Sequence, residues 1–183
     1  MIKDIFSVPI YTSFVSENIA NEIENLVVSR LHLLKKNKEQ STDFYNESKT
    51  VLPHEIINLT NEINIQCLNY AKLTNSIIGS KINYWVQDYS PNDFHRPHVH
   101  QASLLSGVYY VRANEQAGYL RFTTPNPYTW ISLYDVPYEE KMYFDVKPQK
   151  GLIILFPSYL IHQVVPSDNN NVERTCIAFN LDK

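Results

Sequence analysis

The stretch "HRPHVHQASLLSGVYYV", residues 95–111, joins a cluster of histidines to a run that is typical of a buried strand. Three of the chain's six histidines lie within its first six positions. The run that follows is aromatic, β-branched and uncharged, which favours a strand inside a folded core. The stretch therefore raises a choice between a metal site and an ordinary polar loop.

The part of the chain around this stretch predicts a β architecture. From Lys81 onward, short aromatic and β-branched runs are separated by turn residues, a pattern typical of an antiparallel sandwich or jelly roll. Gly118 and Gly151 precede two of these runs, as turn glycines should. The runs are KINYWVQDY (81–89), SLLSGVYYV (103–111), GYLRFTT (118–124), MYFDV (142–146), GLIILFP (151–157), IHQVV (161–165) and RTCIAFNL (174–181).

The N-terminal third predicts two amphipathic helices. The first follows Ser16, a plausible N-cap, and the second begins near Pro53, which suits a first helical turn. The second helix carries an apolar stripe formed by Ile56, Leu59, Ile63, Cys67 and Tyr70. We expect a single domain over residues 1–183, with helical support in 1–80 and a jelly-roll core in 81–183. The fold class is then mainly β (α+β), a double-stranded β-helix braced on one outer face by N-terminal helices.

Composition excludes several classes of protein and leaves others open. The net charge of −3, without a block of like charge, argues against duplex nucleic acid as the main partner. Cys67 and Cys176 fall in apolar segments and are expected to be reduced thiols of a cytoplasmic protein. We expect neither a signal peptide nor a membrane span, because no long apolar run occurs. The first helix could support a homodimer or simply cover its own sheet.

Three histidines are candidates for metal ligands. On a strand, the spacing of His98 and His100 would put both imidazoles on one face, with Cα atoms roughly 6.6 Å apart. Neutral imidazole is a preferred ligand of iron, zinc and copper. His162 follows a buried strand and a Pro-containing turn, in an apolar run that contains no Asp, Glu, Lys or Arg. By itself His162 is better explained as a hydrogen-bonded core histidine, and only the order of the motifs favours a metal ligand.

Arg174 completes the candidate site. It opens the last strand on the same face as Cys176, Ala178 and Asn180. A buried guanidinium is costly unless it meets an anion. Arg174 could form a salt bridge with Glu173 or another acidic residue, or it could clamp a dicarboxylate cosubstrate through paired hydrogen bonds.

Taken in order, these elements resemble the non-haem iron, 2-oxoglutarate-dependent oxygenases, in particular a small branch of bacterial and phage proteins. The likeness rests on "HVH" (98–100), "SGVYYV" (106–111), "GLIILFPSYLIH" (151–162) and "RTCIAFN" (174–180). The opening "DIFSVPIYTSFV" and the segment around Trp85 are also similar, so the resemblance covers nearly the whole chain.

The resemblance implies Fe(II) held by His98, His100 and His162, with 2-oxoglutarate and O2 as cosubstrates. Arg174 would bind the distal carboxylate of 2-oxoglutarate, and Tyr110 matches a position that often hydrogen-bonds the same group. Tyr110 could equally be one more packed ring of the sheet. The implied reaction is hydroxylation of a C–H bond with release of succinate and CO2. The substrate stays open among a small molecule, a protein side chain and a nucleobase.

One departure from the family pattern concerns His100. Most relatives carry a carboxylate at this position, which with two histidines forms the usual facial triad. Asp93 or Asp88 could supply a carboxylate if the upstream loop folds back. His95 is expected in a loop that flanks the site.

Two further readings of the sequence remain. A cupin-type metalloenzyme would use the three histidines without 2-oxoglutarate. A non-catalytic jelly-roll module would have a binding or structural role, and its histidines would hold zinc or no metal.

The long segment of residues 123–143 could form a substrate-facing rim or brace the barrel. Its aromatic candidates are Tyr128, Trp130, Tyr134 and Tyr138.

Overall fold

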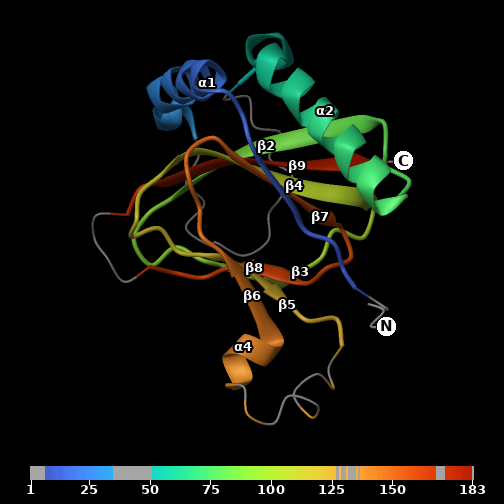
Figure 1. Ribbon diagram of the computed structural model, residues 1–183. Helices are drawn as coiled ribbons and strands as arrows, with labels where there is room; N and C mark the ends of the chain where they lie inside the picture. The colour runs from blue at the N-terminus through green and yellow to red at the C-terminus, as the bar shows by residue number, and fades with distance from the viewer. Residues whose placement is uncertain are drawn as a thin grey trace.

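The computed structural model describes residues 7–34, 51–126, 128, 131, 135, 137–167 and 172–182, and two facing antiparallel sheets form its centre (Figure 1). The larger sheet contains, in spatial order, β1 (Tyr11–Phe14), β7 (Leu152–Pro157), β4 (Ser103–Ala113), β9 (Arg174–Asp182) and β2 (Lys81–Tyr89). The smaller sheet contains β3 (His95–His98), β8 (His162–Val164), β5 (Leu120–Thr123) and β6 (Tyr143–Val146).

Successive strands pass from one sheet to the other along much of the chain. β2, β4, β7 and β9 belong to the larger sheet, whereas β3, β5, β6 and β8 belong to the smaller one. This winding is the double-stranded β-helix, so the predicted jelly roll is confirmed. The winding brings three strand ends that are far apart in sequence to one pocket between the sheets. They are the last residue of β3 and the first residues of β8 and β9.

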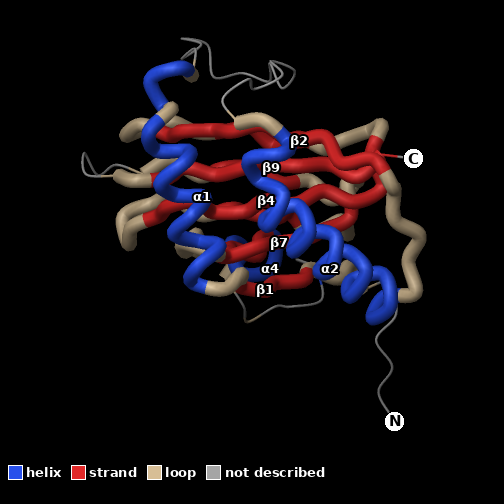
Figure 2. The backbone as a smooth tube through the Cα atoms, turned by 90° about the horizontal axis from the view of Figure 1, so that it is seen from above, coloured by secondary structure: helices blue, strands red, loops and turns tan. Residues whose placement is uncertain are grey.

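Helices cover the outer face of the larger sheet (Figure 2). They are α1 (Glu17–Ser29), the short 3-10 turns η1 (Leu31–Leu33) and η2 (Pro53–Ile56), and α2 (Ile57–Thr74). All five residues of the predicted second stripe are buried. The short helix α4 (Tyr138–Met142) lies at the opposite side of the molecule and leads into β6 (Figure 1).

Two hydrophobic clusters fill the layers on either side of the larger sheet. Ile177 and Phe179 of β9 belong to the cluster under the helices, whereas Cys176 and Ala178 belong to the cluster between the sheets. The predicted division of β9 into two faces is therefore confirmed.

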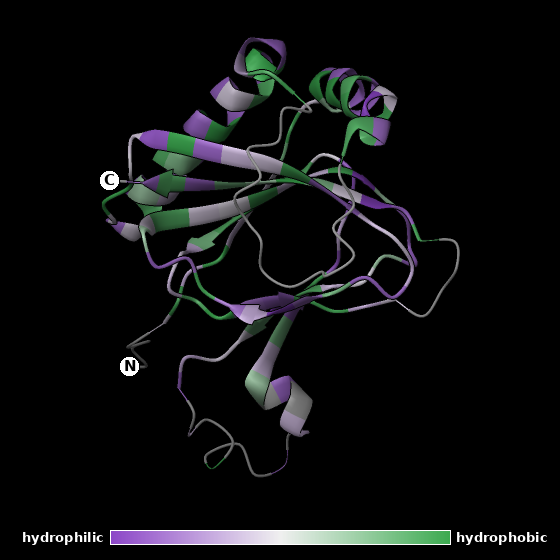
Figure 3. Ribbon diagram, turned by 180° about the vertical axis from the view of Figure 1, so that it is seen from behind, coloured by the Kyte–Doolittle hydropathy of each residue, from purple (hydrophilic) through white to green (hydrophobic). Residues whose placement is uncertain are grey.

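The two covering helices carry hydrophobic as well as hydrophilic residues, as a half-buried helix requires (Figure 3).

The apolar face of α1, for which the sequence allowed either a dimer contact or the protein's own sheet, packs against that sheet. Ala20, Ile23 and Val27 are buried in the cluster between the helices and the larger sheet. Covering its own sheet thus accounts for this stripe. In the described part of the chain, no helix has both the length and the apolar character needed to cross a bilayer.

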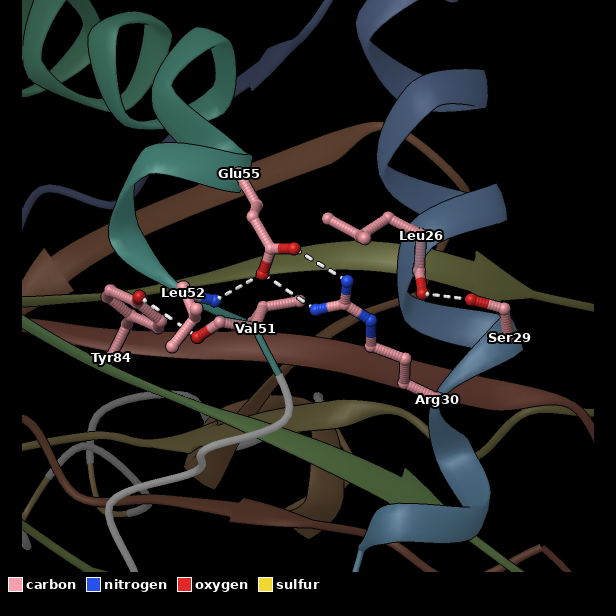
Figure 4. Close-up of polar contacts among 7 residues, drawn as sticks. All are labelled: Leu26, Ser29, Arg30, Val51, Leu52, Glu55 and Tyr84. Carbon is pink, nitrogen blue, oxygen red and sulfur yellow. Dashed lines mark hydrogen bonds and ion pairs between the residues drawn. The ribbon is translucent and has the colours of Figure 1, made fainter.

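An ion pair joins the two helical segments (Figure 4). Arg30 donates from Nη1 and Nη2 to the two carboxylate oxygens of Glu55, each at 2.6 Å. The backbone N–H of Leu52 donates to Glu55 Oε2 at 2.8 Å, which closes the first turn of η2. These hydrogen bonds hold the end of α1 against the start of the second helical segment.

The structure differs from the sequence prediction in several elements. The N-terminal part contains a strand, β1, that was not predicted. The N-cap of α1 is Ser16, as predicted. His95 begins β3 instead of lying in a loop, and β3 ends at His98, so His100 lies beyond it. The expectation that both histidines of H-x-H share a strand face was therefore wrong. The polar stretch "SDNNN" (167–171), which predicts a hairpin loop, lies outside the described residues except for Ser167.

Candidate metal and anion site

Antiparallel pairing of β3 with β8 brings two of the histidines together. His98 is the last residue of β3 and faces His162, the first residue of β8, across the ladder. His100 follows in the turn, where its backbone N–H donates to the carbonyl oxygen of Ser158 at 2.9 Å. This hydrogen bond fixes the backbone of His100 beyond the end of β3.

The three imidazoles converge. Ligand atoms of His98, His100 and His162 all lie within 4.8 Å of one another, an arrangement that could hold a metal ion. The Nε2 atoms of His100 and His162 are 3.3 Å apart. The ring centroids of His98 and His162 are separated by 4.2 Å.

Backbone carbonyls orient two of these rings. His98 Nδ1 lies 2.7 Å from the carbonyl oxygen of Arg96, and His162 Nδ1 lies 2.9 Å from that of Leu160. A carbonyl only accepts, so each Nδ1 carries the proton, and the ring lone pair is on Nε2. Such a contact is the usual way in which a metal-binding histidine is fixed. His100 Nδ1 instead meets a side-chain amide, that of Asn180, at 3.2 Å.

Burial keeps all three imidazoles neutral near pH 7. Burial, with the neighbouring His98, lowers the pKa of His100 to about 4. It also lowers the pKa of His98, and it lowers that of His162 well below the ordinary value. The neutral imidazole is the form that binds a metal ion, because a protonated ring has no lone pair to give.

The alternative ligands lie elsewhere. Asp93 Oδ2 accepts the backbone N–H of Ser90 at 2.7 Å, and Asp88 accepts a hydrogen bond from Thr175 at 2.6 Å. Neither carboxylate belongs to the group of converging ligand atoms. His95 is buried beside His98, with ring centroids 4.4 Å apart, but is also outside that group. Burial lowers the pKa of His95 to about 3.

Arg174 is buried without a carboxylate partner among the residues that the structure describes. Its side chain is 2% exposed, and Nη2 donates to Tyr110 Oη at 3.3 Å. Nε and Nη1 are buried with no hydrogen-bond partner in the described part of the chain. The predicted alternative, a salt bridge between Arg174 and Glu173, does not form. Glu173 is instead the ion-pair partner of Arg112, with 3.9 Å between Oε1 and Nη1. Buried donors left unpaired are costly, which points to an anionic ligand.

The triad and the guanidinium line the same pocket. Its wall includes His98, His100, His162 and Arg174. Trp85, Gln87 and Tyr89 of the edge strand β2 also line it. A metal ion and an anion could therefore be bound in one cavity.

Sequence reasoning missed Tyr89 at this site. Its ring packs on the guanidinium of Arg174, with 4.6 Å between Cζ and the ring centroid. Tyr89 and Arg174 are direct partners in the β2–β9 ladder. Only the strand register reveals this contact. The alternation of Trp85, Gln87 and Tyr89 along β2 was the available signal.

The predicted aromatic rim is described only in part. Tyr128 and Tyr138 are exposed. Trp130 and Tyr134 lie outside the described residues. Tyr143, at the end of this segment, packs under the guanidinium of Arg121 at 4.7 Å.

Comparison with known families gives a direct result. A family model described as "Putative 2OG-Fe(II) oxygenase" matches residues 83–180, which is more than half of the chain. The chain belongs to this family. The matched region contains the three histidines, Tyr110 and Arg174. Membership implies Fe(II), 2-oxoglutarate and O2, and the neutral imidazoles and the unpaired guanidinium fit that set.

Solved structures of prolyl hydroxylases share the fold of this oxygenase. A Pseudomonas putida prolyl-4-hydroxylase is 14% identical, with a TM-score of 0.68 over 95% of this chain and 92% of its own. A Trichoplax adhaerens prolyl hydroxylase, solved with a hypoxia inducible factor oxygen degradation domain peptide fragment, is also 14% identical. Its TM-score is 0.61 over 96% of this chain and 83% of its own. No curated protein matches by sequence.

Proposed function

We propose that this oxygenase is an Fe(II)- and 2-oxoglutarate-dependent dioxygenase that hydroxylates a C–H bond and releases succinate and CO2. His98, His100 and His162 are the proposed metal ligands, and Arg174 the proposed partner of the distal carboxylate. The observation that carries the proposal is the buried guanidinium of Arg174, whose Nε and Nη1 lack partners among the described residues, facing the pocket that the triad lines.

The residues of the chain have separate roles in the proposed reaction. With Fe(II) bound, the site would supply activation of O2 coupled to oxidative decarboxylation of 2-oxoglutarate. His98 and His162, fixed by backbone carbonyls, would present Nε2 to the metal. Arg174 would orient the cosubstrate, while Tyr89 and Tyr110 hold the guanidinium. Apolar side chains of the pocket, such as Val108 and Phe156, would exclude water.

Replacing the carboxylate of the usual triad by His100 changes the charge of the site. Three neutral imidazoles leave the full +2 charge of the ferrous ion uncompensated by the protein. The proposed site should therefore attract the dianionic cosubstrate more strongly and should show a shifted reduction potential.

The test is binding of 2-oxoglutarate, measured anaerobically with Fe(II) by calorimetry. We expect Arg174→Gln to keep the metal but to lose about 100-fold or more in cosubstrate affinity, because hydrogen bonds between charged groups are lost. Arg112→Gln is the matched control, since Arg112 pairs with Asp88 at 3.3 Å and does not line the pocket.

Metal content and product formation separate the alternatives. His98→Ala and His162→Ala should lose the metal, whereas His95→Ala should retain it. Metal-dependent oxygen consumption without succinate would favour a cupin-type enzyme. Failure to bind either metal or 2-oxoglutarate would leave a non-catalytic module.

The substrate class and the setting are also proposals. The Trichoplax neighbour was solved with a peptide, which supports including peptides beside small molecules and nucleobases in a substrate screen. The two cysteines are free and buried, which fits a cytoplasmic protein with reduced thiols. We propose that residues 1–183 act as one domain.

A further inference from the structure

A buried row of polar side chains lies behind His100, and no step of the proposed reaction uses it. Ser106 on β4 and Ser158 after β7 are each 1% exposed, and Asn180 on β9 is 5% exposed. Ser106 Oγ lies 2.7 Å from Ser158 Oγ and donates to Asn180 Oδ1 at 2.8 Å. Asn180 Nδ2 faces His100 Nδ1 at 3.2 Å. Such a row is maintained inside an apolar sandwich only if its hydrogen bonds are satisfied.

The orientation of the Asn180 amide defines the tautomer of His100. Because Nδ2 is a donor, His100 Nδ1 must accept, and the ring proton then sits on Nε2. That proton points at His162 Nε2, 3.3 Å away. His162 Nε2 can accept it, since Nδ1 of the same ring donates to the carbonyl of Leu160. In the metal-free protein, His100 and His162 are thus joined by a hydrogen bond.

This tautomer cannot bind a metal ion through the converging atom. An Nε2 that carries a proton has no lone pair to give. For His100 to become a ligand, the proton must sit on Nδ1, and Nδ1 then needs an acceptor. Asn180 supplies one if its amide makes a half-turn and presents Oδ1.

Ser106 and Ser158 satisfy the amide in both orientations. A hydroxyl can donate or accept. When Asn180 presents Nδ2 to the ring, Ser106 donates to Oδ1 and accepts from Ser158. After the half-turn, Ser106 accepts from Nδ2 and donates to Ser158 Oγ. Neither state leaves the amide without a partner.

We propose that Asn180 is a positioning residue for His100, whose amide presents Nδ2 to the ring in the metal-free protein and Oδ1 when the triad holds a metal ion. Ser106 and Ser158 exchange donor and acceptor roles in step. The inference rests on the proposed function in one respect, the assignment of His100 as a ligand. It adds a local rearrangement that accompanies metal binding.

The tautomer can be measured directly. Long-range 1H–15N correlation of the histidine rings, with and without Zn2+, reports which nitrogen of His100 carries the proton. We expect the proton on Nε2 in the metal-free protein and on Nδ1 in the zinc-bound protein. The same tautomer in both states would overturn the proposal.

Substitutions give a second readout, the affinity for Zn2+. Asn180→Leu should lower it about 10- to 100-fold, the usual effect of removing the partner of a metal-binding histidine. Asn180→Asp should restore it, because a carboxylate accepts from Nδ1–H. Asn83→Leu is the matched control, since Asn83 lies opposite Asn180 in the ladder but bonds to Asp182.

The outcomes separate this inference from the proposed function. If His98→Ala and His162→Ala do not weaken zinc binding, the metal site itself is wrong. If those variants lose zinc but Asn180→Leu binds like the wild type, only the role of Asn180 is wrong. Should Asn180→Leu fail to fold, Ser106→Ala replaces it, with an expected loss of affinity that Asn180→Asp does not show.

Discussion

Two tyrosines from different strands hold the guanidinium of Arg174. Tyr89 packs against its face from the edge strand β2, and Tyr110 accepts a hydrogen bond from Nη2. Burial raises the pKa of Tyr110, so its hydroxyl stays protonated near neutral pH. This leaves Nε and Nη1 of Arg174 as the donors for the proposed ligand.

Tyr110→Phe should lower the affinity for 2-oxoglutarate by about 2- to 10-fold. The variant keeps the ring but removes one hydrogen bond that orients Arg174, and a net bond is worth about 0.5–1.5 kcal/mol. Calorimetry with the metal-loaded protein under nitrogen measures the change. Tyr109→Phe is the control, because Tyr109 belongs to the cluster under the helices, whereas Tyr110 belongs to the cluster between the sheets. An equal loss in both variants would contradict the role of Tyr110.

At the residue level, the sequence indicated the three histidines, Arg174 and Tyr110, but not Tyr89 or the role of Asn180. The order of motifs indicated His98, His162 and Arg174, since each follows or opens a recognisable strand. Tyr89 and Asn180 act through their positions across the sheets. Those positions depend on strand register, which alternation of apolar residues does not determine.

At the element scale, β4 depends on a glycine. Gly107 lies opposite Phe179 of β9, and a Cβ atom at Gly107 would stand 2.3 Å from Phe179 Cζ and 2.9 Å from the carbonyl oxygen of Ile154. The ring of Phe179 therefore occupies the space that a side chain at position 107 would need. Only glycine lets the backbone of β4 lie this close to the ring.

Gly107→Ala should destabilise the protein by about 1–3 kcal/mol, the usual cost of overpacking a core. Urea unfolding followed by circular dichroism measures the loss. Adding Phe179→Leu should recover part of it, because a smaller side chain leaves room for the methyl group. Strictly additive losses in the double variant would show that the two positions do not compete for space.

The ion pair between Arg30 and Glu55 should make the free energy of unfolding depend on pH in the acidic range. The hydrogen bonds from Arg30 and from the backbone of Leu52 lower the pKa of Glu55 from 4.5 to about 2. A pKa lowered by folding gives a contribution that is complete above about pH 4.5 and disappears as the pH falls toward 2.

Glu55→Gln should therefore be less stable than the wild type at pH 7. The difference in stability between the two proteins should become smaller as the pH falls from 4.5 to 2. Thermal unfolding at a series of pH values measures it. Arg30→Gln should show the same narrowing, since it removes the partner. A gap that stays constant across this range would rule out a contribution from the ionised pair.

The elements themselves were predictable where an apolar stripe or a continuous apolar run marks them. The stripe of α2 and the runs of β7 and β9 are found as expected. β1 was missed because its four residues pair only along one side, with β7, and carry little hydrophobic pattern. The position of His100 was misjudged because β3 ends two residues earlier than its sequence suggests.

At the scale of the whole molecule, the larger sheet is covered on both faces. Helices cover one face and the smaller sheet covers the other, which explains why β4, β7 and β9 are almost fully buried (Figures 1 and 2). The aromatic, β-branched composition indicated two sheets. It did not determine which strands pair, because pairing depends on contacts between distant segments.

Metal binding should stabilise the folded protein as a whole. His98, His100 and His162 meet only when β3 and β8 pair, so Zn2+ binds the folded state in preference to the unfolded chain. At 100 times the dissociation constant, the gain is about 2.7 kcal/mol, which for a chain of this size raises Tm by roughly 5–10 °C. Scanning calorimetry with and without zinc measures it. The shift should vanish in His162→Ala, and its persistence there would place the metal elsewhere.

Two of the proposed ligands, His98 and His162, belong to the smaller sheet, whereas Arg174 belongs to the larger one. The core residues between the sheets, among them Phe122 and Phe156, keep the layers apart. Packed sheets lie about 10 Å from each other. If the metal and 2-oxoglutarate bind as proposed, the spacing of the two sheets would limit the length of the keto acid that can reach both the metal and Arg174. Oxaloacetate, one carbon shorter, would fall short of the guanidinium, and 2-oxoadipate, one carbon longer, would have to bend.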